Sequence, residues 1–199
     1  MPKQKENRSS VFRKLAVLYK DMEENYAEVA QKIGLACTGC ANNCCTSYFM
    51  HHTYVEWAYL WKGIKSLPSA ERAVFLEKAT QYASQTKTDL MNGTRPHTMC
   101  PLNKDGLCGL YSHRLMICRM HGVPNTLTAP DGSTRVFPGC YQSQELIRQM
   151  DHPPVLDRTA LYMRLVQLEI AFVGPKKIRT LPRVNLTLAE MLEQGPPRV

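Results

Sequence analysis

Four cysteines stand within nine residues between Cys37 and Cys45, in the run Cys-Thr-Gly-Cys-Ala-Asn-Asn-Cys-Cys. The remaining four of the eight cysteines form a looser second group: Cys100, Cys108, Cys118 and Cys140. Thiolates are ligands for soft metal ions and iron–sulfur clusters, and chance rarely gathers cysteines this densely. We therefore predict that residues 37–140 form a metal-binding region in which helices bring the two groups together.

The first group has two parts with different geometry. Cys37 and Cys40 form a Cys-x-x-Cys knuckle, whose spacing lets both sulfurs face one ion. Cys44 and Cys45 are adjacent, so their side chains point apart. One of this pair can then serve the first site while the other serves a second site or packs inward. Buried free thiols or a regulatory disulfide are the alternatives to ligation.

The second group is more dispersed. Cys100 precedes Pro101, as in iron–sulfur ligands where proline removes a competing backbone donor. Cys108 and Cys140 each stand beside a glycine, and Cys118 falls on a probable helical turn. A single cysteine is usually a small core residue. We predict ligation for all four because they follow the dense first group.

Other residues near the cysteines suggest accessory roles. A guanidinium from Arg114 or Arg119 would lower the net charge of a thiolate site, although a surface arginine is an equally good reading. Tyr111 is expected to pack against the site and not to catalyse. His121, three residues after Cys118, could complete a mixed site. The methionines near the cysteines are better explained as core residues than as copper(I) ligands.

These motifs together resemble a known family. The matching residues run in order through Cys37 to Cys45, Cys100-Pro101, Cys108-Gly109-Leu110-Tyr111, Arg114 and Cys118-Arg119. They resemble the YkgJ-type cysteine-cluster family, whose Cys-x2-Cys-x2-Cys-Cys domain is described as zinc- or iron-chelating. Two departures are visible: three residues separate Cys40 from Cys44, and Leu115 stands where proline is usual. The first leaves open which of Cys44 and Cys45 is the ligand.

The resemblance implies a metal cofactor and leaves enzymatic activity open. An iron–sulfur cluster, favoured as the [4Fe–4S] type, or zinc is the implied cofactor. The same domain occurs in flagellin lysine methylases, which implies an alternative function as an iron–sulfur-dependent protein-modifying enzyme. The chain has no Gly-x-Gly-x-x-Gly nucleotide loop, which weakens the case for this methylase-like alternative. A structural zinc protein that binds a partner is the second alternative.

Composition bounds these interpretations. The chain has 199 residues, is 44% hydrophobic and carries a net charge of +8. The excess of Lys and Arg is dispersed, so nucleic acid is not the favoured partner. No secretion signal or membrane-spanning run is recognised, which predicts a cytoplasmic protein with reduced thiols and no membrane partner. The metal is the predicted ligand, and a protein partner or substrate stays open.

Amphipathic patterns predict the helices that position the cysteines. Ser9 and Ser10 should cap a helix from Val11 to Gly34. Its apolar stripe comprises Phe12, Leu15, Tyr19, Met22, Tyr26, Val29 and Ile33. Thr53 and Glu56 predict a capping box for a second helix. Its apolar face comprises Trp57, Leu60, Trp61 and Ile64.

Three further elements follow along the chain. Pro68 should lie in the first turn of a third helix that Asn92-Gly93 ends. Its predicted face is Ala73, Leu76, Ala79, Ala83 and Leu90. Residues 126–128 and 134–136 flank Pro130-Asp131-Gly132 and predict a small β-hairpin.

The C-terminal part adds two more helices. Pro153-Pro154 should open a fourth long helix that ends at Gly174 and carries Leu161, Leu165, Leu168 and Phe172. Thr187 and Glu190 predict a capping box for a last short helix. Residues 95–119 show little periodicity and should be a loop-rich segment that a metal orders. The prediction is a mainly α protein of a single helical domain, residues 1–199, with a cysteine-rich loop region and a small hairpin.

Overall fold

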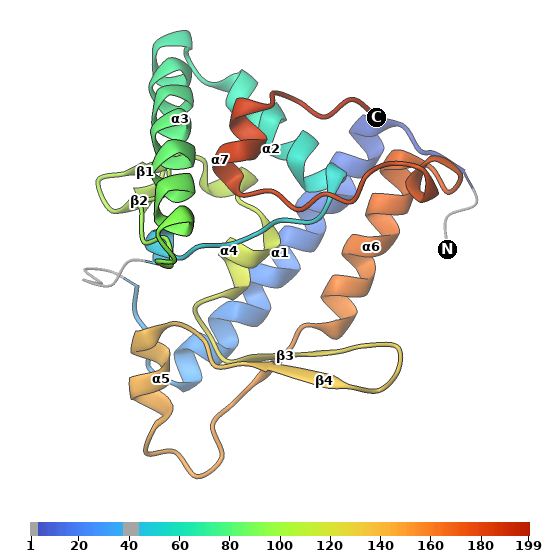
Figure 1. Ribbon diagram of the computed structural model, residues 1–199. Coiled ribbons are helices and arrows are strands. Elements are labelled where there is room, and N and C mark those ends of the chain that lie inside the picture. The colour runs from blue at the N-terminus through green and yellow to red at the C-terminus, as the bar shows by residue number, and fades with distance from the viewer. Residues whose placement is uncertain (1–3, 38–43) are drawn as a thin grey trace. The chain divides into compact units, whose positions relative to one another are not determined.

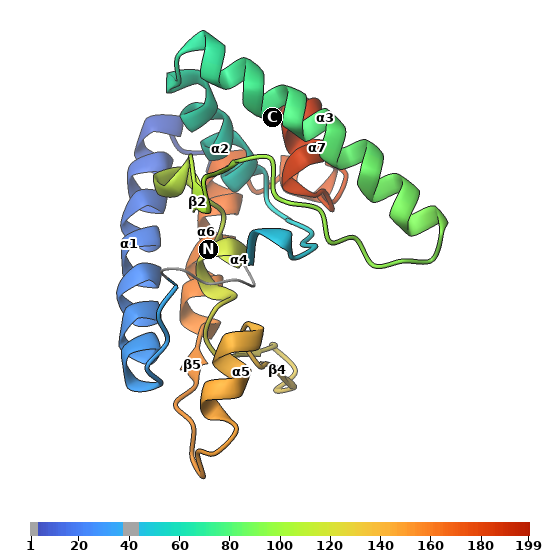
Figure 2. The ribbon, with the colours of Figure 1, turned by 90° about the vertical axis from the view of Figure 1, so that its left-hand side faces the viewer.

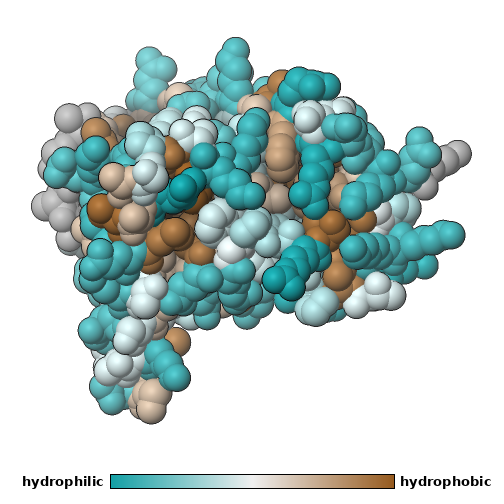
Figure 3. Space-filling model, turned by 90° about the horizontal axis from the view of Figure 1, so that it is seen from above, coloured by the Kyte–Doolittle hydropathy of each residue, from teal (hydrophilic) through white to brown (hydrophobic). Residues whose placement is uncertain are grey.

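A computed structural model of the chain describes residues 4–37 and 44–199. Its described residues form seven α-helices and five short strands in two small sheets, so the fold is mainly α, as predicted (Figure 1). None of the described helices has both the length and the apolar character needed to cross a membrane. Hydrophilic side chains cover much of the face shown in Figure 3, with smaller hydrophobic areas between them.

The chain forms two compact units, each assembled from separate stretches of sequence. Unit 1 comprises Met1–Cys44 and Met116–Pro175, and unit 2 comprises Cys45–Leu115 and Lys176–Val199. The prediction of a single domain concerns how the units associate, and it stays a prediction.

Unit 1 is built on two long helices. Its helices are α1 (Arg8–Lys32), α4 (Met116–Met120), α5 (Tyr141–Ile147) and α6 (Thr159–Val173). Helices α1 and α6 pack along each other, and α4 also packs on α1 (Figure 1). The stacked rings of Phe12 and Phe172, with centroids 5.8 Å apart, join α1 to α6. Burial of apolar side chains along this seam is the main stabilising contribution in unit 1.

The start of α1 differs from the prediction. Asn7, and not Ser9 or Ser10, is the N-cap, because its side-chain oxygen accepts a hydrogen bond from the backbone N–H of Ser9 at 2.8 Å. The predicted stripe is otherwise confirmed, since five of its members are buried and Phe12 and Tyr26 are half-buried. Gly34 follows the helix with φ +69°, a conformation that favours glycine.

The strands of unit 1 explain why the fourth long helix does not begin at Pro153-Pro154 as predicted. Strands β3 (Asn125–Thr128) and β4 (Thr134–Phe137) form the predicted hairpin. Strand β5 (Leu156–Asp157) pairs in parallel with β3. The segment after Pro153-Pro154 is therefore extended, and α6 begins at Thr159 instead of at the prolines. The predicted apolar face of α6 is confirmed, because Leu161, Leu165, Leu168 and Phe172 are all buried.

Unit 2 packs three helices around one core. Its helices are α2 (Tyr54–Ser66), α3 (Ser69–Met91) and α7 (Leu188–Glu193), and its strands are β1 (Asn103–Lys104) and β2 (Leu107–Cys108). Helix α7 lies against α3 in both ribbon views (Figure 1, Figure 2). The predicted face of α2 is confirmed, since Trp57, Leu60, Trp61 and Ile64 all belong to the core. The predicted capping box of α7 is also confirmed.

Two predictions in unit 2 were wrong in detail. The buried face of α3 is formed by Phe75, Ala79, Tyr82 and Thr86, so only Ala79 of the predicted face is buried. The larger aromatic side chains of Phe75 and Tyr82 bury more apolar area than the alanines, and they orient the helix. At α2, Thr53 is the N-cap, but its hydroxyl donates to the Glu56 carboxylate at 2.8 Å and does not accept from the backbone.

His51 should make the stability of the protein depend on pH. Its side chain is buried, and its Nδ1 has no hydrogen-bond partner among the described residues. Burial, and secondarily the nearby His52, lowers the pKa of His51 to about 3 from an ordinary value of 6.5. Below the ordinary pKa of 6.5, His51 binds a proton in the unfolded chain but stays neutral in the folded chain. The contribution of the neutral His51 to stability is therefore fully present above the ordinary pKa of 6.5. It is lost progressively as the pH falls from 6.5 toward the folded-state pKa of about 3.

The size of this effect follows from the linkage between protonation and folding. The slope is at most about 1.4 kcal/mol per pH unit, so the loss reaches about 2–3 kcal/mol near pH 4.5. Urea unfolding of the wild type and of His51→Gln at neutral and acidic pH measures it. The pH-dependent loss should shrink by that amount in His51→Gln and persist in the control His52→Gln, whose ring is exposed. An equal loss in His51→Gln and the wild type would exclude His51 as the cause.

Candidate metal centre

The described cysteines are divided between the two units. Unit 1 contains Cys37, Cys44, Cys118 and Cys140, and unit 2 contains Cys45, Cys100 and Cys108. Cys40 lies outside the described residues. Each unit thus combines members of both sequence groups, and the boundary between the units falls between the adjacent Cys44 and Cys45.

The hydroxyl of Tyr26 contacts one thiol of unit 1. The Tyr26 Oη atom is 3.7 Å from Cys37 Sγ, within the range of a hydrogen bond to sulfur. Burial raises the pKa of Tyr26 well above its ordinary value, and Cys37, Cys140 and Cys44 raise it further. The phenol therefore keeps its proton at neutral pH and is available as a donor. The helix α1 therefore brings a half-buried hydroxyl into contact with Cys37.

Two glycines allow the chain to pass close to Tyr26. A Cβ atom at Gly122 would lie 2.0 Å from Tyr26 Oη, so only glycine fits beside the hydroxyl. The carbonyl of Gly122 accepts a hydrogen bond from the backbone N–H of Cys140 at 3.1 Å. Gly139 has φ +84°, which turns the chain into Cys140. The backbone after the hairpin is thereby fixed with Cys140 near Tyr26.

Ser143 adds an unsatisfied polar atom to the same place. The residue is fully buried, and its Oγ has no hydrogen-bond partner among the described residues. A Cβ atom at Gly139 would lie 2.8 Å from this Oγ and 2.8 Å from the Gly122 carbonyl oxygen. A buried hydroxyl without a partner costs free energy, so it marks a place where a polar ligand or water fits.

Cys118 and Arg119 lie on α4, which packs on α1. Arg119 is only 3% exposed, and its guanidinium lies 4.1 Å from the ring centroid of Tyr19. Stacking of a guanidinium on an aromatic face holds the cation in the interior of unit 1. The predicted role of Arg119 at a thiolate site stays a prediction.

Unit 2 holds a second set of thiols. The backbone N–H of Cys100 donates to the Cys45 carbonyl at 2.8 Å, which joins the two sequence groups within this unit. Cys108 pairs with Asn103 in the β1–β2 hairpin, and Cys100 and Cys108 both pack against the core. Burial raises the pKa of Tyr82, and the nearby Cys100 adds to the effect. A helix tyrosine therefore lies near thiols in unit 2 as well.

Tyr111 and Arg114 form a pair of their own in unit 2. The Arg114 guanidinium lies 4.0 Å from the Tyr111 ring centroid, and Nη2 donates to Tyr111 Oη at 3.0 Å. Tyr111 is 48% exposed. The described contacts therefore place Tyr111 at the surface beside Arg114.

The described thiols of unit 1 have the chemistry of metal ligands, but they are not gathered around one point. Among the described residues, no three His, Cys, Asp or Glu side chains are positioned to share one ion. Cys37 and Cys44 are exposed, so their side chains can rotate without repacking a core. Four thiolates satisfy the tetrahedral preference of zinc and the ligand requirement of a cubane iron–sulfur cluster. The described unit 1 thiols supply that number.

Comparison of the chain with protein-family models, curated proteins and solved structures finds no match. The chemistry of the candidate site therefore rests on the arrangement of its own residues.

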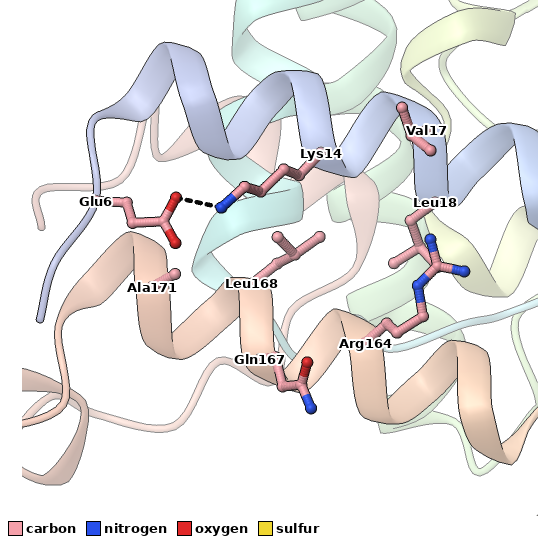
Figure 4. A pocket seen from close by; sticks show the side chains of 8 residues that line it. All are labelled: Glu6, Lys14, Val17, Leu18, Arg164, Gln167, Leu168 and Ala171. Atoms are coloured by element: carbon pink, nitrogen blue, oxygen red, sulfur yellow. Dashed lines mark hydrogen bonds and ion pairs between the residues drawn. The ribbon is translucent and has the colours of Figure 1, made fainter. Parts of the chain in front are cut away.

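A separate cavity of about 340 Å³ lies along α1 and α6 in unit 1 (Figure 4). Its lining consists of Glu6, Lys14, Val17, Leu18, Arg164, Gln167, Leu168 and Ala171. Lys14 Nζ is 2.6 Å from the Glu6 carboxylate, and Arg164 Nη1 is 2.6 Å from that of Asp21. Both cations are thus already neutralised, and none of the lining residues is a cysteine.

Sequence reasoning missed two polar residues of the unit 1 site. Tyr26 occupies a position of the apolar stripe, so the pattern assigned it to the core. Ser143 lies in α5, a short helix without apolar periodicity that was not predicted. The only local signal for Ser143 was its position three residues after a cysteine.

Proposed function

We propose that this protein binds a thiolate-ligated metal, as an iron–sulfur cluster or as chelated zinc or iron. The observation that carries the proposal is that unit 1 combines Cys37 and Cys44 of the first cysteine group with Cys118 and Cys140 of the second. These cysteines come from both ends of the predicted metal-binding region. The proposal assigns these four thiols to one site, and Cys40 lies outside the described residues.

Three properties of the described residues support this function. Each unit combines cysteines from both sequence groups. The buried Arg119 follows Cys118 and supplies positive charge within the unit that would hold an anionic thiolate site. The unpartnered Ser143 hydroxyl leaves a polar atom near Cys140 that a bound group could satisfy.

The family resemblance and the cellular setting belong to the same proposal. The order of the cysteine motifs is that of the YkgJ-type family, whose domain is described as zinc- or iron-chelating. We favour a [4Fe–4S] cluster over zinc because eight thiolates exceed the needs of one structural zinc site. A cytoplasmic location would keep the thiols reduced and available. A bound cluster would supply one-electron chemistry, whereas zinc would supply structural cross-linking.

Elemental analysis of anaerobically purified protein tests the proposal. Iron and acid-labile sulfide in equal amounts, with a brown colour that air removes, are the expected result for a cluster. Zinc without sulfide, in colourless protein, would replace the cluster by the zinc form. Protein that retains neither metal after expression with iron and zinc, and that binds neither on reconstitution, would contradict metal binding altogether.

A further inference from the structure

We propose that Arg135 and Arg158 form a binding site for a phosphate monoester on one face of the three-stranded sheet of unit 1. The site contains no cysteine, so it is independent of the proposed metal function. Strand register, an aromatic contact and the missing counter-charge of Arg158 support it.

The register of the strands places both arginines on the same face of the sheet. Leu127 of β3 pairs with Arg135 of β4. On the other side of β3, Thr126 pairs with Asp157 of β5, so Arg158 follows beside Leu127. The backbone N–H of Arg158 donates to the Thr126 carbonyl at 3.0 Å, as a parallel register requires. Side chains of laterally adjacent residues point to the same face, so the two arginines flank Leu127 there.

Phe137 holds the guanidinium of Arg158 on this face. Phe137 is two residues after Arg135 in β4, so both side chains lie on the same face. The Arg158 guanidinium lies 4.1 Å from the centroid of the Phe137 ring. Stacking on an aromatic ring orients a guanidinium and leaves the N–H groups at its edge available to an oxyanion. The donor fork is therefore positioned before a ligand arrives.

No counter-charge for Arg158 is present among the described residues. The side chain is half-buried and forms no ion pair there, and its Nε atom is buried without a hydrogen-bond partner. Burial lowers the pKa of Arg158, and the nearby Tyr162 acts in the opposite direction. The adjacent Asp157 does not compensate, because its carboxylate accepts hydrogen bonds from the backbone N–H and the hydroxyl of Thr159. A partly desolvated cation without a counter-charge is costly, and a bound anion removes that cost.

Arg135 supplies the second positive charge of the site. It is exposed and forms no ion pair with any described residue. The pKa of Asp131, in the hairpin turn, is lowered mainly by hydrogen bonds from Ser133, and Arg135 has the smallest effect on it. Two guanidinium groups balance the charge of a phosphate monoester, which is close to two at neutral pH, and their donors match its oxygens. The charge count therefore favours a monoester over a carboxylate or a phosphodiester, each of which carries a single charge.

The test is a calorimetric titration of the full chain with phenyl phosphate at constant ionic strength. The wild type should show saturable binding at a single site. Arg158→Gln and Arg135→Gln should each lower the affinity by about tenfold or more, because each removes charge-assisted hydrogen bonds. Arg158→Lys should keep only part of the affinity, since an ammonium group keeps the charge but not the donor fork.

Arg164→Gln is the matched control. Arg164 lies on α6 in the same unit, but its Nη1 atom is already 2.6 Å from the Asp21 carboxylate. The control removes the same charge and should leave the affinity unchanged. Thermal melting without ligand shows whether each variant is folded, and phenyl phosphate should raise the melting temperature of the wild type but not of Arg158→Gln. Because Arg135 is exposed, Arg135→Gln tests the site even if Arg158→Gln fails to fold.

The contrary results are distinct. An equal loss of affinity in Arg164→Gln would show that only net charge matters, and it would overturn the site. Acetate or dimethyl phosphate that bound as tightly as phenyl phosphate, and as sensitively to Arg158→Gln, would overturn the assignment to a monoester. Absence of saturable binding by the wild type would overturn the inference altogether, whereas the metal content of the protein would be unaffected.

Discussion

Replacing Cys37 with alanine is expected to lower the affinity of unit 1 for a thiolate-bound metal by more than about 100-fold. Loss of an outer hydrogen-bonding partner already costs about 10–100-fold, and loss of a ligand costs more. Cys140→Ala should have an effect of the same size, because the proposal assigns both thiols to the same site. Since either loss disables the same site, the double variant should bind no more weakly than the worse single variant.

Metal content per chain and cobalt(II) affinity of the purified variants measure this effect. The matched control is Cys100→Ala, which removes a thiol from unit 2. It should leave unchanged the sulfur-to-cobalt charge-transfer band that cobalt(II) gives when it is bound at the site of Cys37 and Cys140. If Cys100→Ala removed the same metal, the ligand set given for unit 1 would be wrong. If the affinity losses of Cys37→Ala and Cys140→Ala added up in the double variant, the two thiols would not share one ion.

The long helices and α7 were predictable because each of them carries a local signal of sufficient length, which the short helices α4 and α5 lack. The stripe of α1, the faces of α2 and α6, and the capping box of α7 depend on residues three and four positions apart. The face of α3 was not predictable in this way. Its exposed side carries Val74 and Leu90, both about half exposed, so two apolar stripes competed. Only the tertiary contacts of Phe75 and Tyr82 decide between them.

The division into two units depends on long-range packing that no local pattern reveals. Unit 1 joins α1 to residues that begin at Met116, and the intervening stretch belongs to unit 2. Strand β5 has two residues and pairs with β3 through a parallel register, which a short sequence run cannot specify.

The cysteines themselves were visible in the sequence, but their polar neighbours were not. Tyr26 fits an apolar heptad position, whereas in space its hydroxyl contacts Cys37 and lies against Gly122. Spacing identifies ligands when a motif is compact, as between Cys37 and Cys45. It does not identify donors that reach the site from a helix face.

Replacing Trp61 with alanine is the largest stability change that we expect, with a loss of about 3–5 kcal/mol from the free energy of unfolding. Trp61 belongs to the core of unit 2, where its ring joins α2 to the C-terminal segment. Its Nε1–H donates to the Met191 carbonyl at 2.8 Å, and that of Trp57 donates to the same oxygen at 2.9 Å. Alanine would leave a cavity and remove one of these two donors.

The two tryptophans matter together because Met191 lies in the last turn of α7. Carbonyls in this position lack a helical partner. The N–H of Gly195, four residues on, donates to Leu192 instead. The indole groups therefore satisfy a buried acceptor that the helix cannot satisfy, and they fix α7 on α2.

Phenylalanine substitutions separate the hydrogen bonds from the packing. Trp57→Phe or Trp61→Phe alone leaves one donor on the Met191 carbonyl, so the lost hydrogen bond should cost only about 0.5–1.5 kcal/mol beyond the lost ring area. The double variant leaves the carbonyl unpaired, and urea unfolding should show an extra loss of about 1–3 kcal/mol over the sum of the singles. Tyr54→Phe, which removes an exposed hydrogen bond to Pro182, is the control and should cost less than either. Strict additivity of Trp57→Phe and Trp61→Phe would mean that water replaces the indoles, and that α7 is held by apolar contacts alone.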